Sequence, residues 1–340
     1  MLRWTALIFL ALCSGTSLAD VKPKLVVYTY DSFISKWGPG PSIKNSFELS
    51  CACEVQWVPA ADGAASLARL RIEGSRSQAD VLLGLDDTLT YTAEKMGLFW
   101  DSGVTLSHSN LPEGFKPSTV FIPFDYGYYG FMFDTKAKSS SGNVFSKPAS
   151  LAELLESKEL DRSILIQDPR SSATGLGLLL WLQSIYGKDT TKQLIKLKNK
   201  TLTVSRGWSD SYSLFTKGEA PLVFSYTTSE AFHRDHDKVS RYEALIFPEG
   251  HYAAIETVAV LKSSRQKDLA KAFIKFLISE RSQANIASMN WMYPANFVSK
   301  GLPPSYATIK KPVKLLRLTP KDVDGNRMTW TKQWDQSFRP

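Results

Sequence analysis

The chain has 340 residues, of which 43% are hydrophobic and 22% charged, and its formal net charge is +8. This is the composition of an ordinary globular protein, which excludes a disordered or collagen-like chain, and the length suggests two domains. The Lys and Arg residues are scattered and form no run of about five or more, so the positive charge does not indicate a nucleic-acid-binding protein. After the N-terminus, no further run of about 18 apolar residues predicts a membrane span.

The N-terminal residues have the pattern of a secretory signal. Arg3 precedes the short apolar run 6–13, and small residues at 17 and 19 lie before an expected cleavage site ahead of Asp20. We therefore expect residues 1–19 to be a signal peptide and the mature protein to be periplasmic. A buried N-terminal helix is one alternative, and a lipid anchor on the cysteine of the apolar run is another.

Cleavage at this site would remove Cys13 and leave Cys51 and Cys53. Exported proteins fold in an oxidising compartment, where two remaining thiols often pair. The sequence therefore favours a structural disulfide between these two residues, with free thiols as the second interpretation. Catalytic redox chemistry is a weak alternative, because the C-x-x-C spacing is absent.

Strands and helices alternate along the first third of the chain. β-branched and aromatic runs favour strands, and apolar residues three or four apart favour helices. The sequence predicts strands at 24–30, 54–58 and 79–83, and helices at 43–49 and 64–73. This alternation is typical of an α/β architecture with a mainly parallel sheet.

The same alternation resumes in the middle of the chain. The sequence predicts strands at 164–166, 202–204 and 222–226, and helices at 176–186, 209–217 and 229–237. Between these two α/β units, segment 120–134 is rich in aromatic residues and glycine and predicts an extended crossing. Segments 244–247 and 254–261 predict a second crossing, by which the chain would return to the first lobe; two independent tandem domains are the alternative. Helices are predicted at 266–278 and 320–334.

No catalytic motif is present in the sequence. It has no dinucleotide fingerprint, P-loop, G-x-S-x-G elbow or H-E-x-x-H pair. His233 and His236 have i,i+3 spacing, but two ligands do not make a metal site, and we expect both on a helix surface. An exported α/β chain without a catalytic constellation indicates a binding protein, so no enzymatic activity, metal or cofactor is expected.

Candidate binding residues lie where predicted strands end and helices begin, which is where open α/β sheets bind ligands. Each has an ordinary interpretation, because a lone aromatic ring usually packs in the core and a Ser or Thr before a helix usually caps it. Together they favour a small ligand with two chemistries. Aromatic faces attract a flat or cationic group, and hydroxyl and N–H groups at helix N-termini attract an anion.

The sequence resembles the periplasmic thiamine-binding proteins of bacterial thiamine ABC importers. The segments that carry the resemblance are 27–33, 37–41, 79–86, 123–128, 167–170, 175–181, 207–209, 225–229, 249–252 and 290–294. The resemblance implies an α/β, two-lobed, type II periplasmic-binding-protein-like fold. Each lobe would be a mainly parallel sheet flanked by helices, with the ligand cleft between the lobes. The expected lobe boundaries are 20–124 with 251–340 for the first lobe and 125–250 for the second.

The resemblance also implies a set of ligand contacts. By position they fall on Asp62, Gly63, Ser172, Ala173, Trp208, Tyr226, Thr227, Thr228 and Ser229, and the aromatic walls fall on Tyr30, Trp37, Phe232 and Trp291. The implied ligands are thiamine, thiamine monophosphate and thiamine diphosphate. The implied partners are the permease and ATPase subunits of an ABC importer, with the receptor a monomer.

Two positions depart from the family pattern. Relatives often have a hydroxyl where Ala173 lies and a Tyr where Phe232 lies. Both differences bear on the preference among thiamine and its phosphates more than on thiamine binding itself.

Two other functions remain open at this stage. One is a ferric-iron or anion receptor of the same fold, for which the adjacent Tyr128 and Tyr129 are candidate ligands. The other is an exported thiamine-degrading enzyme, which would need a cysteine nucleophile, Cys51 or Cys53, with a carboxylate base.

Overall fold

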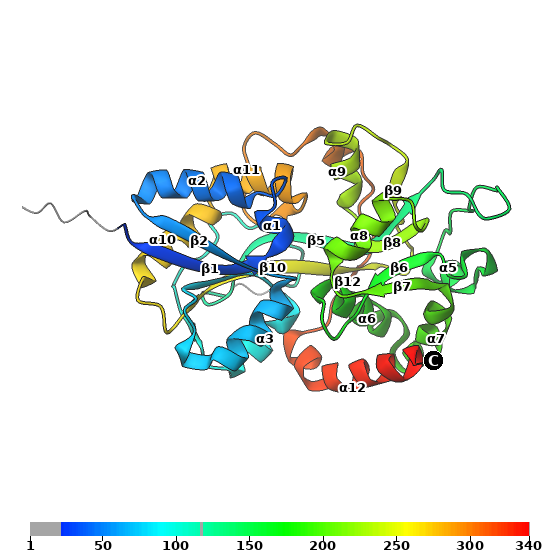
Figure 1. Cartoon of the computed structure of the whole chain (residues 1–340), viewed down its shortest axis with the longest axis horizontal. Helices are drawn as coiled ribbons and strands as arrows, with labels where there is room; N and C mark the ends of the chain where they lie inside the picture. Colours follow the sequence, from blue (N-terminus) through cyan, green and yellow to red (C-terminus); the bar gives the residue numbers. More distant parts are fainter. Residues whose placement is uncertain (1–21, 116–117, 340) are drawn as a thin grey trace, which may run out of the picture.

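The computed structural model describes residues 22–115 and 118–339, so the expected signal peptide lies outside the described residues (Figure 1). The strands are β1 (Lys24–Tyr30), β2 (Glu54–Ala60), β3 (Val81–Asp86), β4 (Phe99–Trp100), β5 (Ile122–Asp134), β6 (Ile164–Gln167), β7 (Thr201–Ser205), β8 (Leu222–Tyr226), β9 (Tyr242–Ala244), β10 (His251–Leu261), β11 (Tyr293–Pro294) and β12 (Leu315–Leu316). The helices are α1 (Asp31–Ile34), α2 (Gly40–Cys51), α3 (Gly63–Glu73), α4 (Thr90–Lys95), α5 (Leu151–Glu156), α6 (Ala173–Tyr186), α7 (Thr190–Lys200), α8 (Trp208–Thr216), α9 (Ser229–Asp235), α10 (Lys267–Leu277), α11 (Glu280–Asn285) and α12 (Pro320–Phe338), and a π-helical turn covers Ile286–Asn290.

The predicted strands and helices are confirmed, with most ends shifted by a few residues. In α10 the apolar positions Ala270, Phe273, Ile274 and Leu277 are all buried, as their helical spacing requires. One prediction is wrong: β9 ends at Ala244, and the second crossing is made by β10 alone.

The strands form a mixed sheet in the order β2-β1-β3-β10-β5-β8-β6-β7. The outer pairs are parallel, whereas β10 is antiparallel to both β3 and β5. The long strand β5 pairs with β10 along its first half and with β8 and β9 along its second half. These two central strands therefore join two α/β halves.

We call the half with β1–β4, α1–α4, α10 and α11 the first lobe, and the half with β6–β9 and α5–α9 the second lobe. They lie on the left and right of Figure 1, with β5 and β10 running between them. The expected boundary at 124/125 falls inside β5, and the boundary at 250/251 falls just before β10. The division into domains itself stays a prediction.

A disulfide and the C-terminal helix lie at the periphery of the two lobes. A disulfide joins Cys51 at the end of α2 to Cys53 just before β2, as the cysteine count predicted. Helix α12 contacts α4 in the first lobe and α6 and α7 in the second, and its Val323 and Trp334 are buried. Among the described residues, no helix combines the length and apolarity that a bilayer crossing requires.

Candidate ligand-binding site

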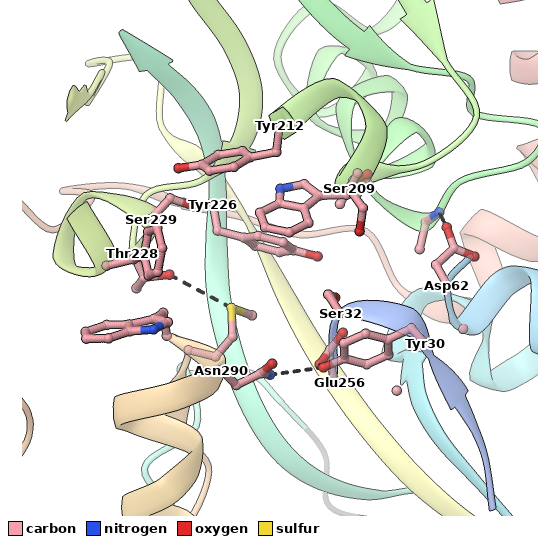
Figure 2. A pocket seen from close by; sticks show the side chains of 18 of the residues that line it. Tyr30, Ser32, Asp62, Ser209, Tyr212, Tyr226, Thr228, Ser229, Glu256 and Asn290 are labelled. Carbon is pink, nitrogen blue, oxygen red and sulfur yellow. Dashed lines mark hydrogen bonds between the residues drawn. The ribbon is translucent and has the colours of Figure 1, made fainter. Parts of the chain in front are cut away.

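A cavity of about 370 Å³ lies between the two lobes, where strands of both lobes end and helices begin (Figure 2). Its lining includes Tyr30 at the end of β1, Asp62 before α3, Trp208 at the start of α8 and Tyr226 at the end of β8. The chain thus uses the strand-end position that α/β sheets favour for ligands. No Lys or Arg is found among the described residues that line the cavity.

The first-lobe rim depends on a close approach between α3 and β3. A Cβ atom placed on Gly63 would lie 1.9 Å from the carbonyl oxygen of Gly84, so only glycine fits at the first residue of α3. Gly84 itself has φ +90° and lies under the ring of Tyr30. These two glycines let the N-terminus of α3 and the Tyr30 ring reach the cavity together.

Asp62 connects the two lobes across this rim. Its Oδ1 accepts a hydrogen bond of 3.0 Å from the N–H of Ala65, which caps α3, and its Oδ2 accepts one of 2.6 Å from the N–H of Ala173 at the start of α6. Burial raises the pKa of Asp62, and the N–H donors oppose that shift. A carboxylate therefore lies at two helix N-termini, which is where an anion is attracted.

The second lobe supplies an aromatic wall. The indole of Trp208 stacks on Tyr212 with ring centroids 4.6 Å apart, and its Nε1 donates a 2.8 Å hydrogen bond to Ser225 Oγ. Tyr226 lines the same cavity and stacks on the buried Tyr129, with ring centroids 5.2 Å apart (Figure 2). Burial raises the pKa of Tyr226 well above its usual value, so its ring stays neutral. These held rings offer faces for a flat or cationic group.

A second group of aromatic residues closes the side formed by α9 and the π-helical turn. Phe232 meets Trp291 edge to face, with ring centroids 5.7 Å apart. Trp291 adopts φ 54°, a left-handed conformation that ends the turn and places the indole beside the cavity. Thr228 donates to the sulfur of Met292 at 3.9 Å, which positions both at the cavity surface.

The cavity floor contains a row of three acidic residues on adjacent strands. In the sheet register, Glu256 of β10 pairs with Asp86 of β3 on one side and with Asp125 of β5 on the other. Directly opposed residues of antiparallel strands have their side chains on the same face, and like charges placed this way repel each other. Asp86 and Asp125 are buried, whereas Glu256 is only partly buried, and both Asp86 and Glu256 line the cavity.

Neutral donors surround this acidic row. The hydroxyl of Tyr30 donates to Glu256 Oε2 at 2.6 Å, and Asn290 Nδ2 donates to Asp125 Oδ2 at 2.6 Å and to Tyr30 Oη at 3.0 Å. Tyr129 donates to Asp86 Oδ2 at 3.0 Å. Desolvation raises the pKa of Glu256 to about 7 and raises the pKa of Asp125 well above its ordinary value, with the neighbouring carboxyl as a further cause at Asp125.

Most residues that the sequence placed at the site do line this one cavity. They are Tyr30, Trp37, Asp62, Gly63, Ala173, Trp208, Tyr226, Thr228, Ser229, Phe232 and Trp291. Ser172 and Thr227 are buried behind its wall instead. The hydroxyl of Ser172 caps α6 by accepting a hydrogen bond from the N–H of Gly175. The N–H of Thr227 donates a hydrogen bond to the carbonyl of Tyr128. Both residues therefore take part in the hydrogen bonding of their own secondary-structure elements.

Several residues of the lining are not among the ligand contacts that the resemblance implied. They are Ser32, Ala61, Gly84, Asp86, Thr174, Ser209, Tyr212, Ser213, Thr216, His236, Glu256, Asn290 and Met292. A signal existed for Glu256, because it is a single carboxylate within a long apolar strand, where charged side chains are rarely placed without a purpose.

The structure bears on two sets of possible metal ligands from the sequence, the histidine pair and the tyrosine pair. The expectation that His233 lies on a helix surface is wrong: the ring is fully buried, between Tyr212 at 2.8 Å and Asp237 at 2.8 Å. Tyr128 and Tyr129 are neighbours on β5, so their side chains point to opposite faces. Among the described residues, no group of three or more His, Cys, Asp or Glu side chains is arranged to hold a metal ion.

Two lobes joined by two long strands, with a cavity between them, have the architecture of a receptor for a small solute. The model of the bacterial extracellular solute-binding protein family matches residues 52–284, and the chain belongs to this family. The expected two-lobed fold is thereby confirmed.

More specific relatives share most of the chain. It is 45% identical to a thiamine-binding periplasmic protein of Escherichia coli (strain K12), over 96% of this chain and 97% of that protein. It is 44% identical to a thiamine-binding periplasmic protein of Brucella melitensis biotype 1, over 93% of this chain and 92% of that protein. A solved structure of a periplasmic thiamin binding protein is 44% identical, covers 95% of this chain and 98% of its own, and superposes with a TM-score of 0.89. A ferric binding protein from Campylobacter jejuni, at 18% identity and a TM-score of 0.73, shares the fold alone.

Proposed function

We propose that the chain is an exported receptor that captures thiamine between its two lobes and delivers it to the membrane subunits of an ABC importer. The observation that carries the proposal is the combination of neutral aromatic faces and carboxyl groups around a cavity without Lys or Arg among its described lining residues. Thiamine has a permanent thiazolium charge and a flat aminopyrimidine ring. A desolvated cation over an aromatic face gains about 2 kcal/mol or more.

The proposal includes export to the periplasm through residues 1–19 and a receptor without catalytic activity. The names of the relatives support the location. The cysteines that a thiamine-degrading enzyme would need are joined to each other in the disulfide, and neither lines the cavity. A nucleophilic thiolate is therefore not provided at this site.

The phosphate esters of thiamine are also proposed ligands. Their phosphate would lie at the N-termini of α3 and α6. Because the carboxylate of Asp62 already accepts hydrogen bonds from Ala65 and Ala173, and position 173 has no hydroxyl, we expect thiamine to bind more tightly than either ester. Tighter binding of the diphosphate would contradict this order.

The test is isothermal titration of the mature protein, stripped of carried-over ligand by unfolding and refolding, with thiamine and its two phosphates. We expect one-to-one binding of thiamine. Replacing Trp208 or Tyr226 by Ala should weaken binding by about 30-fold, the equivalent of roughly 2 kcal/mol for a lost cation–aromatic contact.

The matched control is Phe297→Ala, which removes an aromatic ring that is 53% exposed and does not line the cavity. This variant should bind as the wild type does. Absence of binding heat and of thermal stabilisation with all three compounds would show that the receptor is for another solute.

A further inference from the structure

The acidic row on the cavity floor is not explained by the packing of the aromatic walls. Glu256 is opposed by a carboxyl group on each side, from Asp86 and from Asp125. Two carboxylates in this arrangement repel each other, and a buried pair commonly retains one proton between them. In the protein without ligand, this row is therefore an incompletely neutralised acidic site.

Hydrogen bonds already hold most of the row in place. Asp86 accepts from Tyr129 and from the N–H and hydroxyl of Thr88, so its two oxygens are occupied. Asp125 is fully buried, accepts from Asn290 through one oxygen, and has a second oxygen without a donor. It lies directly opposite Glu256 in the sheet register, and the Glu256 carboxyl is a further cause, after desolvation, of its raised pKa.

Glu256 is the member of the row that is most open to a ligand, because it is only partly buried, whereas Asp86, which also lines the cavity, is buried. Glu256 lines the cavity, and in Figure 2 it lies between Tyr30 and Asn290 and across from Tyr226. A ring held against the aromatic wall therefore faces this carboxyl. Because no Lys or Arg is present in the described lining, the compensating positive charge has to come from the ligand.

We propose that Glu256 is the residue that selects a positively charged ring, and that the Glu256–Asp125 pair releases a proton to solvent when that ring enters the cavity. This inference rests on the proposed function, since the thiazolium ring of thiamine is the cation. It adds a specificity determinant and a coupled proton to that function. The only covalent bond that breaks is the carboxyl O–H bond of the released proton, which passes to solvent.

Every titratable group that faces Glu256 has to be included in the expected pH dependence. These groups are Tyr30 of β1, Asp62 before α3, Asp86 of β3, Asp125 and Tyr129 of β5, and Tyr226 of β8. Burial raises the pKa of each tyrosine, so the tyrosines remain neutral through the range tested. Glu256 has a pKa raised to about 7, so it is the group expected to lose its proton near neutral pH.

The experiment compares thiamine with its uncharged analogue, in which a thiophene replaces the thiazolium ring. Both contain the same aminopyrimidine, so the analogue controls for protonation of that ring. Titrations in two buffers of different ionisation enthalpy count the protons released. About a pH unit below 7, wild-type protein should release close to one proton per thiamine and none per analogue, and thiamine affinity should rise with pH by up to tenfold per unit.

Glu256→Gln should abolish the proton release and weaken thiamine binding by about tenfold or more, while changing the affinity for the analogue by less than about threefold. The matched control is Glu54→Gln, since Glu54 is a strand glutamate whose side chain is 56% exposed and does not line the cavity. It should behave as the wild type does.

Thiamine binding without proton release in the wild type would overturn the inference, and so would equal weakening of both ligands by Glu256→Gln. If wild-type protein bound neither compound, the proposed function would fail first. If Glu256→Gln does not fold, the number of protons released on thiamine binding by the wild type and by Asp125→Asn still tests the inference. Both measurements report on the same carboxyl pair.

Discussion

The ionised form of the Glu256 side chain destabilises the folded protein when no ligand is bound. Glu256 lies between Asp86 and Asp125 on a largely buried sheet, and desolvation raises its pKa to about 7 from an ordinary value of 4.5. A carboxyl whose pKa is higher in the folded state stabilises the fold below its unfolded pKa and loses that contribution as the pH rises through the folded pKa. The ligand-free protein should therefore lose stability between about pH 4.5 and pH 7 on account of this group.

This effect gives a prediction for the protein without ligand. At about pH 8, Glu256→Gln should raise the free energy of unfolding by about 1–3 kcal/mol relative to wild type, because it removes the ionised carboxyl from the row. At about pH 4.5 the two proteins should differ little. Urea unfolding at both pH values measures the difference, with the exposed Glu54→Gln as control. An equal change at both pH values would show that packing, and not ionisation, is responsible.

The start of α3 shows how much of the site depends on local backbone geometry. Gly63 lies against the carbonyl of Gly84, and Asp62 before it caps the helix and reaches across to α6. The sequence allowed Asp62 and Gly63 to be placed at a helix start, because capping is decided within three or four residues. The contact with β3 is long-range, and no local pattern reveals it.

A pair of glycine substitutions tests this contact. Gly63→Ala should lower the free energy of unfolding by more than about 2 kcal/mol and weaken ligand binding, because its Cβ would meet backbone that cannot yield. Gly207→Ala at the start of α8 should be tolerated, since the nearest atom to its Cβ would be that of Ala61 at 3.8 Å. Thermal unfolding of both variants provides the comparison. Equal stability of the two would mean that α3 can move away from β3.

The same distinction explains which parts of the site were predictable from sequence. Aromatic and capping residues next to strand ends, such as Trp208 and Asp62, are recognisable from their position in the alternation of strands and helices. The row of Asp86, Asp125 and Glu256 arises from the register of three strands that are far apart in sequence. Register depends on how whole strands pack, so the individual segments contain no sign that these carboxyls meet.

Asp62 is also one of the contacts that hold the two lobes together across the cavity. Its 2.6 Å hydrogen bond to the N–H of Ala173 joins the first lobe to the second, and Ser209 makes a second such contact to Asp31 at 3.1 Å. A receptor that closes on its ligand shifts between more open and more closed arrangements. Contacts of this kind favour the closed arrangement even without ligand.

Asp62→Ser separates the two roles of this side chain. Serine still caps α3, so the free energy of unfolding should change by less than about 1 kcal/mol, but its short side chain does not reach Ala173. The ligand-free variant should therefore have a larger radius of gyration than wild type by small-angle X-ray scattering. An unchanged radius would show that the central strands alone set the spacing of the lobes.

Helix α12 has a mechanical consequence for any such motion. Near one end, Asp324 is bound to Lys95 of the first lobe at 2.9 Å, and near the other, Asp335 is bound to Arg170 of the second lobe at 2.8 Å. A helix is stiff along its axis, so eleven residues act as a strut that keeps these two anchors roughly 16 Å apart. These two contacts favour a swing of the lobes about a line near this strut over a sliding motion, and we expect α9 and α11, at the opposite edge of the molecule in Figure 1, to travel farthest.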